Sequence, residues 1–275
     1  MSLKNFFLFL STSLLLSSCS VKKFKNLDYK APQIKETPAP TLNVFSKRKP
    51  ADSLQPVLIF VYGGNWNSGK KEIYNRIGRN FAANDVTVVI PDYTKSPVAS
   101  YDDMTVQIAQ AIKWTQENIK DYSGDPNQIY ITGHSAGGHL GALAVMNKKY
   151  QIEPNLIKGI ILNDAAGLDM YTYFLENKPT EKDDYISTWT LNPETWKEAS
   201  PYYYINETTP EIKIYNGTKT YPSILEGNEL FLEKLEDYQP EAHINYLDKK
   251  HSAMVIQMFF PWNDMIDEIV DFMKK

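Results

Sequence analysis

Ser135 stands between two glycines in the stretch Gly133-His134-Ser135-Ala136-Gly137. The residues just before this stretch, Ile129 to Thr132, are mostly β-branched or aromatic and predict a strand. The small residues that follow it predict a helix. Glycines at such a turn allow a strained backbone that presents the serine hydroxyl at the end of the strand. The pattern therefore predicts a nucleophile, which attacks an acyl carbonyl when a neighbouring base takes its proton.

A nucleophilic serine of this kind also needs N–H donors for the oxyanion that its attack creates. A second glycine pair occurs in the stretch Tyr62-Gly63-Gly64-Asn65-Trp66, directly after an apolar run. Esterases of the α/β-hydrolase fold carry a similar His-Gly-Gly-Gly stretch, or a variant that ends in Trp, at this point; here Tyr62 and Asn65 depart from it. The resemblance implies an oxyanion hole formed by the N–H groups of Gly64 or Asn65 and of Ala136.

The chain resembles the branch of α/β-hydrolase esterases that includes hormone-sensitive lipase, carboxylesterases, acetylxylan and feruloyl esterases, and arylformamidases. The stretches that carry the resemblance are VYGGNWNSGKKEIY, PDYTKSP, AIKWTQENIKDYSGDPNQIYITGHSAGGHL and KKHSAM. They run from Val57 toward the C-terminus, and an aromatic-rich segment between them matches poorly. The resemblance implies a Ser–His–acid triad in the chain order serine, acid, histidine.

The chain has four histidines from which the base must come. His134 lies inside the serine turn, His139 lies on the following helix and is expected to pack, and His243 opens a late predicted strand. His251 follows the end of that strand, in the HSAM context, where this fold places its catalytic histidine. We therefore expect His251 to be the base.

The acid is harder to assign. The esterases that this chain resembles carry an aspartate after the penultimate strand, in a pattern similar to G-x-x-D, and Thr220 occupies that position here. Two carboxylates are candidates: Asp164 ends the strand before, where some members of the fold place their acid, and Glu226 opens the next helix. Each has a structural alternative, Asp164 as a turn residue and Glu226 as a helix first-turn carboxylate. Asp164 ranks above Glu226, and a Ser–His dyad without an acid is the third alternative.

Short β-branched runs alternate with helical segments from Leu54 onward, which predicts a doubly wound, mostly parallel sheet of the α/β-hydrolase type. The predicted strands cover residues 57–62, 87–90, 129–132, 157–163, 212–216 and 244–247. The segment 169–209 interrupts this rhythm and is crowded with Tyr and Trp. We expect it to form a cap-like insertion, whose rings either line a pocket for a sugar or aryl group or pack on one another.

The composition narrows the classes of function. The chain has 275 residues, a formal net charge of −4 and 43% hydrophobic residues, which suits one α/β domain at residues 53–275 and gives no basic footprint for nucleic acid. The sequence contains no H-E-x-x-H motif, no Cys cluster and no G-x-G-x-x-G. We therefore expect neither a metal nor a cofactor.

The N-terminus predicts export. Residues 1–18 combine Lys4, an apolar run from Phe6 to Leu16 and small residues before Cys19, the single cysteine. The order Leu16-Ser17-Ser18-Cys19 resembles a bacterial lipobox, in which Cys19 is the lipidated first residue; an ordinary signal peptide with a stray cysteine is the alternative. Ser20 does not resemble an inner-membrane retention signal, which implies the outer membrane. The Lys- and Pro-rich residues 19–52 are expected to form a flexible tether.

These features predict a membrane-anchored serine hydrolase of carboxylic esters, with acyl groups on polysaccharides as a candidate substrate. An arylformamidase-like amide hydrolase is a second candidate within enzymes. A binding protein that has lost catalysis is a candidate from another class, and the threonine at position 220 is the feature that favours it.

Overall fold

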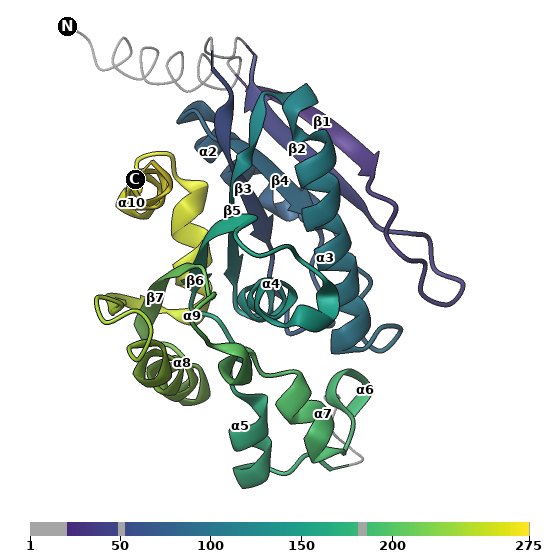
Figure 1. The fold of residues 1–275 in the computed structure, drawn as a ribbon, viewed down its shortest axis with the longest axis vertical. Helices are drawn as coiled ribbons and strands as arrows, with labels where there is room; N and C mark the ends of the chain where they lie inside the picture. The colour runs from purple at the N-terminus through teal and green to yellow at the C-terminus, as the bar shows by residue number, and fades with distance from the viewer. Residues whose placement is uncertain (1–20, 49–52, 181–185, 275) are drawn as a thin grey trace, which may run out of the picture.

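A computed structural model describes residues 21–48, 53–180 and 186–274. Its centre is a twisted eight-stranded sheet with the order β1-β2-β4-β3-β5-β6-β7-β8 (Figure 1). Strand β2 runs antiparallel to β1 and β4, and the remaining neighbours pair in parallel. The strands are β1 (Val21–Asp28), β2 (Thr41–Lys47), β3 (Gln55–Val61), β4 (Thr87–Pro91), β5 (Gly124–His134), β6 (Ile157–Asn163), β7 (Glu211–Lys219) and β8 (Ile244–Lys250).

Helices cover both faces of the sheet. Helices α3 and α4 pack against each other on one face, and α2 and α10 lie on the other (Figure 1). The insertion between β6 and β7 holds α5, α6 and α7, which gather at one end of the molecule. The helices are α2 (Asn75–Ala83), α3 (Tyr101–Asn118), α4 (Ala136–Met146), α5 (Met170–Glu176), α6 (Ile186–Trp189), α7 (Pro193–Glu198), α8 (Pro222–Leu235), α9 (His251–Ile256) and α10 (Asp264–Met273). Short 3-10 helices complete the chain: η1 (Lys71–Tyr74), η2 (Ile119–Tyr122), η3 (Lys148–Tyr150), η4 (Pro201–Tyr204) and η5 (Gln257–Phe259).

The six predicted strands are all present, as β3 to β8, and the predicted α/β-hydrolase architecture is confirmed. The central strands β3 and β5 are buried along most of their length. Both faces of a central parallel strand are covered by helices, so every side chain along it must be apolar or hydrogen-bonded. This constraint explains why β-branched runs marked these strands so clearly in the sequence.

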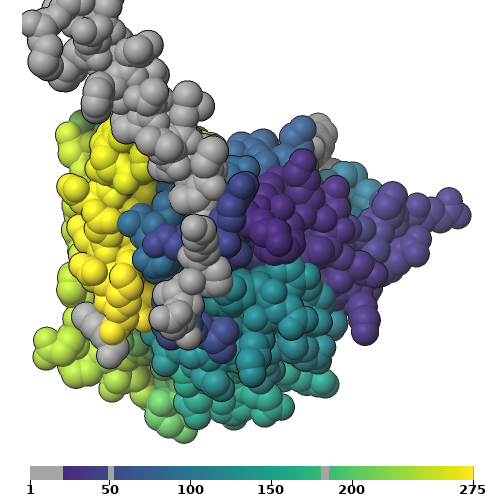
Figure 2. All heavy atoms as spheres, turned by 90° about the horizontal axis from the view of Figure 1, so that it is seen from above, coloured from purple at the N-terminus to yellow at the C-terminus, as the bar shows by residue number. Residues whose placement is uncertain are grey.

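The flexible tether predicted for residues 19–52 is wrong over its described part. Residues 21–28 and 41–47 are strands β1 and β2, which extend the sheet beyond β4. Leu42, Val44 and Phe45 on β2 are fully buried. Figure 2 shows these purple strands packed against the body, with only their connection projecting from it. The segment is therefore part of the domain, because β2 covers the edge that β4 would otherwise expose.

The lysines and prolines of this segment are the reason why the sequence did not predict its strands. The outer strand β1 is a sheet edge whose side chains are mostly exposed or half-buried, so it carries polar residues. The β1–β2 register shifts between Phe24 and Leu27, where Asn26 takes a positive φ of 51°. The Asn26 N–H donates to the buried side chain of Asn43 (3.0 Å). A bulge and an exposed edge together removed the alternation that predicts a strand.

No helix among the described residues is long and apolar enough to cross a membrane. Cys19 and the predicted signal peptide, residues 1–18, lie outside the described part of the chain.

The placement of β2 in the core predicts a large effect of truncating Phe45. Its ring packs against Gly78 of α2, where even a Cβ would approach it to 2.6 Å. Phe45→Ala should lower the free energy of unfolding by about 3–5 kcal/mol, as for other buried phenylalanines. Urea unfolding measures this. Phe260→Ala is the control that should change stability little, because Phe260 is 46% exposed. If Phe45→Ala had the stability of wild type, the packing of β2 in the core would be contradicted and the tether prediction would stand.

Candidate active site

The serine turn joins β5 to α4 and has the strained geometry that its sequence predicts. Ser135 adopts φ 54° and ψ −127°, outside the regions that non-glycine residues prefer. A Cβ at Gly133 would lie 2.3 Å from the backbone of Gly137, and one at Gly137 would lie 2.1 Å from the Val61 carbonyl oxygen. Both glycines are therefore required by close backbone contacts. The turn leaves Ser135 at the carboxyl edge of the sheet, where it lines a cavity.

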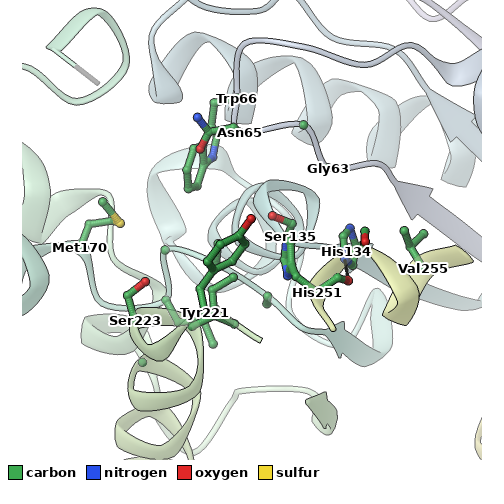
Figure 3. Close-up of a pocket in the computed structure, with 18 of the residues that line it drawn as sticks. Gly63, Asn65, Trp66, His134, Ser135, Met170, Tyr221, Ser223, His251 and Val255 are labelled. Atoms are coloured by element: carbon green, nitrogen blue, oxygen red, sulfur yellow. Dashed lines mark hydrogen bonds between the residues drawn. The ribbon is translucent and has the colours of Figure 1, made fainter. Parts of the chain in front are cut away.

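His251 is the first residue of α9, directly after β8, and lines the same cavity as Ser135 (Figure 3). Its Nδ1 donates a hydrogen bond to Oδ2 of Asp164 at 2.6 Å. This bond leaves Nε2 as the nitrogen that can accept a proton, which is the tautomer that a base beside a serine needs. The structure thus brings Asp164 and His251 together, as the first-ranked alternative for the acid expected.

Asp164 is fully buried, and both oxygens of its carboxylate accept hydrogen bonds. Oδ1 accepts the backbone N–H of Gly217 (2.9 Å), while Oδ2 accepts the hydroxyl of Thr220 (2.5 Å) in addition to His251. A buried carboxylate is tolerated when donors of this number surround it. Glu226, the second candidate, is exposed on α8. Thr220 contacts Asp164 rather than replacing it.

The predicted oxyanion loop, residues 62–66, lies beside the serine turn. A Cβ at Gly63 would stand 3.0 Å from the Cβ of Ser135, so the two backbones are in contact. Gly64 has φ 138°, and its carbonyl accepts the N–H of Ser68 (2.9 Å), which closes a tight turn. Gly64 and Asn65 line the cavity with Ser135. The third predicted donor, Ala136, begins α4, where N–H groups lack acceptors within the helix.

Tyr62 occupies the position at which the resembling esterases carry a histidine. It is fully buried, and its hydroxyl donates to the side chain of Asp92. The Tyr93 hydroxyl donates to the Tyr62 carbonyl at 3.1 Å, and the two rings stack at 4.8 Å. Burial raises the pKa of the Tyr62 phenol far above its usual value, so it stays a neutral donor. These contacts hold the base of the oxyanion loop.

The cavity has a volume of about 780 Å³, within the range of pockets that bind small molecules. Ser68, Ser223 and Ser252 line it together with apolar residues. Tyr221 is 61% exposed at its mouth, with its ring edge-on to that of His251 at 5.3 Å. Figure 3 shows Tyr221, Ser135 and His251 converging on this space.

Most rings of the insertion 169–209 pack on one another rather than line the cavity. Trp189, Trp196 and Phe174 are buried together, and Trp189 stacks on Tyr101 of α3 at 5.5 Å. Tyr173 is the insertion's described aromatic residue that lines the cavity. Of the two alternatives for these rings, the packing one describes the larger part. Tyr185 lies outside the described residues.

His139 links the oxyanion loop to this insertion, a role that its sequence position did not reveal. Its Nδ1 accepts the indole N–H of Trp66 (3.1 Å), and its Nε2 donates to the carbonyl of Ala199 (2.7 Å). Complete burial lowers the pKa of His139 to about 4, so it is a neutral imidazole with both nitrogens satisfied.

The rings of His134 and His251 lie 4.5 Å apart between centroids, and Nε2 of His134 donates to the His251 carbonyl at 3.0 Å. Burial, and then repulsion from a charged His251, lower the pKa of His134 to about 4. In the described part of the chain, the side-chain atoms of His134, Asp164 and His251 form the one group close enough to hold a metal, within 4.8 Å of one another. These atoms are already engaged in the hydrogen bonds above, which suits a proton relay better than a metal centre.

The strand order and the strand–serine–helix turn define the α/β-hydrolase fold. A family model described as BD-FAE matches residues 42–235, and the chain belongs to that family. Three solved esterase structures share the fold: esterase B from Lactobacillus rhamnosis (13% identity, 99% of this chain, 96% of that chain, TM-score 0.74), carboxyl esterase 2 from Tuber melanosporum (21%, 94%, 88%, 0.73) and butyrate-bound Est2 from Thermogutta terrifontis (21%, 90%, 94%, 0.68).

Sequence relatives include esterases from distant organisms. Esterase LipQ of Mycobacterium tuberculosis is 33% identical over 179 residues, which are 60% of this chain and 42% of that protein. The probable isoprenylcysteine alpha-carbonyl methylesterase ICMEL2 of Arabidopsis thaliana is 26% identical over 75% of this chain and 53% of that protein. The chain spans about half the length of the curated relatives it matches.

The two buried histidines predict a pH-dependent stability. A histidine with a native pKa of about 4 takes up a proton in the unfolded chain near pH 6.5 but not in the native state. Stability is therefore full above pH 6.5 and falls as the pH drops toward 4, by up to about 3 kcal/mol for each histidine. Urea unfolding of His139→Gln should show a shallower fall than wild type, although this variant is less stable at pH 7. The exposed His243→Gln should retain the wild-type slope, and equal slopes for His139→Gln and wild type would contradict the assignment.

Proposed function

We propose that the protein is a serine hydrolase of carboxylic esters. The observation that carries this proposal is the 2.6 Å hydrogen bond from His251 to the buried Asp164, in a cavity that also presents the strained Ser135. Buried acid–histidine pairs of this geometry orient a base toward a nucleophile. The names of the relatives, which are esterases and methylesterases, support the same reaction class.

In the proposed mechanism, the Ser135 hydroxyl attacks the ester carbonyl while Nε2 of His251 takes its proton. The resulting oxyanion is stabilised by N–H groups of Gly64 or Asn65 and of Ala136. The imidazolium of His251, held by the Asp164 carboxylate, then protonates the departing alkoxide, and an acyl-serine remains. Water, deprotonated by His251, attacks this acyl group. The imidazolium then returns the proton to the Ser135 oxygen as the acyl–oxygen bond breaks, which releases the carboxylic acid and the free serine.

The alternative of a binding protein rested on the threonine at the expected acid position. The hydrogen bond between His251 and Asp164, at the end of β6, supports catalysis over that alternative, because it offers His251 a carboxylate in place of the one expected at position 220. For the substrate, we propose acyl groups carried on polysaccharides. The exposed rings of Tyr221 and Tyr173 beside the cavity support an alcohol partner with a flat face.

We also propose that the mature protein is lipidated on Cys19 and lies at the outer membrane. A single residue, Ser20, separates Cys19 from β1. Val21 pairs with Lys47, whose side chain binds Asp85 just before β4, so β1 begins at the amino edge of the parallel strands. The candidate site lies at the carboxyl edge, where Ser135 and His251 follow β5 and β8. A lipid at Cys19 would thus leave the cavity open away from the membrane, which suits a polymer rather than a bilayer lipid as substrate.

The triad assignment predicts large losses in hydrolysis of p-nitrophenyl acetate. Ser135→Ala and His251→Ala should each lower kcat by at least about 10³-fold, and the double variant should be scarcely worse because the residues act as a unit. Asp164→Asn should lower kcat by up to about 10⁴-fold with a small change in KM. Glu226→Gln, an exposed carboxylate, is the control. Wild-type activity or fluorophosphonate labelling of Ser135→Ala would overturn the proposal.

The anchor predicts a change of compartment on replacing Cys19. Cys19→Ala should move the protein out of the membrane fraction or leave it unprocessed, and should abolish incorporation of labelled palmitate, because acyl chains on this residue provide the attachment. Ser135→Ala is the control that keeps its label. Membrane partition that is unchanged by Cys19→Ala, without palmitate on either protein, would refute the anchor.

A further inference from the structure

Thr220 occupies a position between the acid and the base that neither the family resemblance nor the proposed triad explains. It follows the end of β7 and is half-buried. Its Oγ1 lies 2.5 Å from Oδ2 of Asp164 and 3.4 Å from Nδ1 of His251. The backbone N–H of Thr220 donates to the Gly217 carbonyl at 3.2 Å, which closes a turn and fixes this placement.

The direction of these hydrogen bonds follows from the chemistry of the groups. The carboxylate can only accept, so the Thr220 hydroxyl donates its proton to Oδ2. His251 also donates to this oxygen, from Nδ1. The lone pairs of the hydroxyl are then left facing the Nδ1–H at 3.4 Å. The Thr220 hydroxyl thus stabilises the carboxylate of Asp164 by donating to Oδ2, and it lies beside the Nδ1–H of His251 that donates to the same oxygen.

The origin of the acid explains why such support is needed. Asp164 follows β6, whereas His251 follows β8, and β7 lies between these two strands in the sheet. The carboxylate must therefore reach across the end of β7 to meet the imidazole. Gly217 and Thr220 from that end each donate one hydrogen bond, one to each carboxylate oxygen. With both oxygens held, the carboxylate cannot rotate away from His251.

We propose that Thr220 is a positioning residue that holds the Asp164 carboxylate toward His251. The inference rests on the proposed function, because it concerns the same triad. Its action passes through Asp164, and it touches neither the substrate nor the reacting atoms. The hydroxyl is the part of the side chain that carries the role, and the methyl group is dispensable.

Comparison of isosteric variants tests the hydroxyl. Thr220→Val keeps the shape and removes the donor, and should lower kcat for p-nitrophenyl acetate by about 10-fold to 100-fold, the usual weight of a hydrogen bond to a charged group. KM should change little, because the oriented carboxylate acts mainly on the imidazolium of the transition state. Thr220→Ser keeps the hydroxyl and should remain within about threefold of wild type. Circular dichroism and thermal unfolding report whether each variant is folded.

Thr218→Val is the matched control, because Thr218 lies two residues away, is exposed, and contacts Asp248 instead of the triad. It should leave kcat unchanged. A folded Thr220→Val with wild-type kcat, or a Thr220→Ser as slow as Thr220→Val, would overturn the inference. If the Thr220 variants gave one of these results while Ser135→Ala was inactive in the same assay, only the inference about Thr220 would fail and the esterase proposal would stand. An active Ser135→Ala would instead refute the proposed function itself.

A carboxylate exchange provides a second, independent test. In the Asp164→Asn background, Thr220→Asp would place a carboxylate within reach of the same His251 nitrogen and should recover at least about 10-fold in kcat over Asp164→Asn alone. In the wild-type background, Thr220→Asp should lower kcat instead, because two adjacent carboxylates repel and one is driven to protonate. A gain in the wild-type background, or no recovery in the double variant, would contradict the placement of this side chain.

Discussion

The buried carboxylate of Asp164 constrains the arrangement of the three strands at one end of the sheet. A carboxylate removed from water is strongly unfavourable unless donors replace its hydration. Here the donors are the N–H of Gly217, the hydroxyl of Thr220 and the imidazole of His251, which come from the ends of β7 and β8. The parallel pairing of β6, β7 and β8 is what aligns these ends.

Ser135, the proposed nucleophile, depends on a second constraint, the close packing of backbones around the serine turn. The turn passes so near to β3 that a side chain at Gly137 would overlap the Val61 carbonyl. The same contact brings the oxyanion loop after β3 against Ser135. The strain at Ser135 therefore persists because the surrounding backbone leaves no alternative. His139, on the helix that follows, extends this rigidity to Trp66 and to the carbonyl of Ala199 in the insertion.

Much of the fold was predictable from local patterns. The strands β3 to β7 each contain a run of buried residues, so their β-branched runs predicted strands clearly. Strand β8 is an edge strand with only Ile244 buried, and it was found from its short run Ile244 to Leu247. The exposed edge strand β1 and its partner β2 were missed, because an edge strand needs polar residues and β1 contains a bulge at Asn26. The aromatic insertion could be located by its length and composition. Whether its rings faced a ligand or one another depended on contacts with Tyr101 on a distant helix.

The sequence by itself indicated the serine turn, the second glycine pair and His251 as the candidate base, because each depends on a short stretch with distinct residue types. It left the acid open between Asp164, Glu226 and none. Only the tertiary structure shows which of these carboxylates contacts His251, since that contact depends on which strand ends meet across the sheet and on the donors available there. Asp164 and Thr220 are 56 residues apart in the chain, yet their side chains share a hydrogen bond. No local pattern encodes that contact, which follows from the order of β6, β7 and β8.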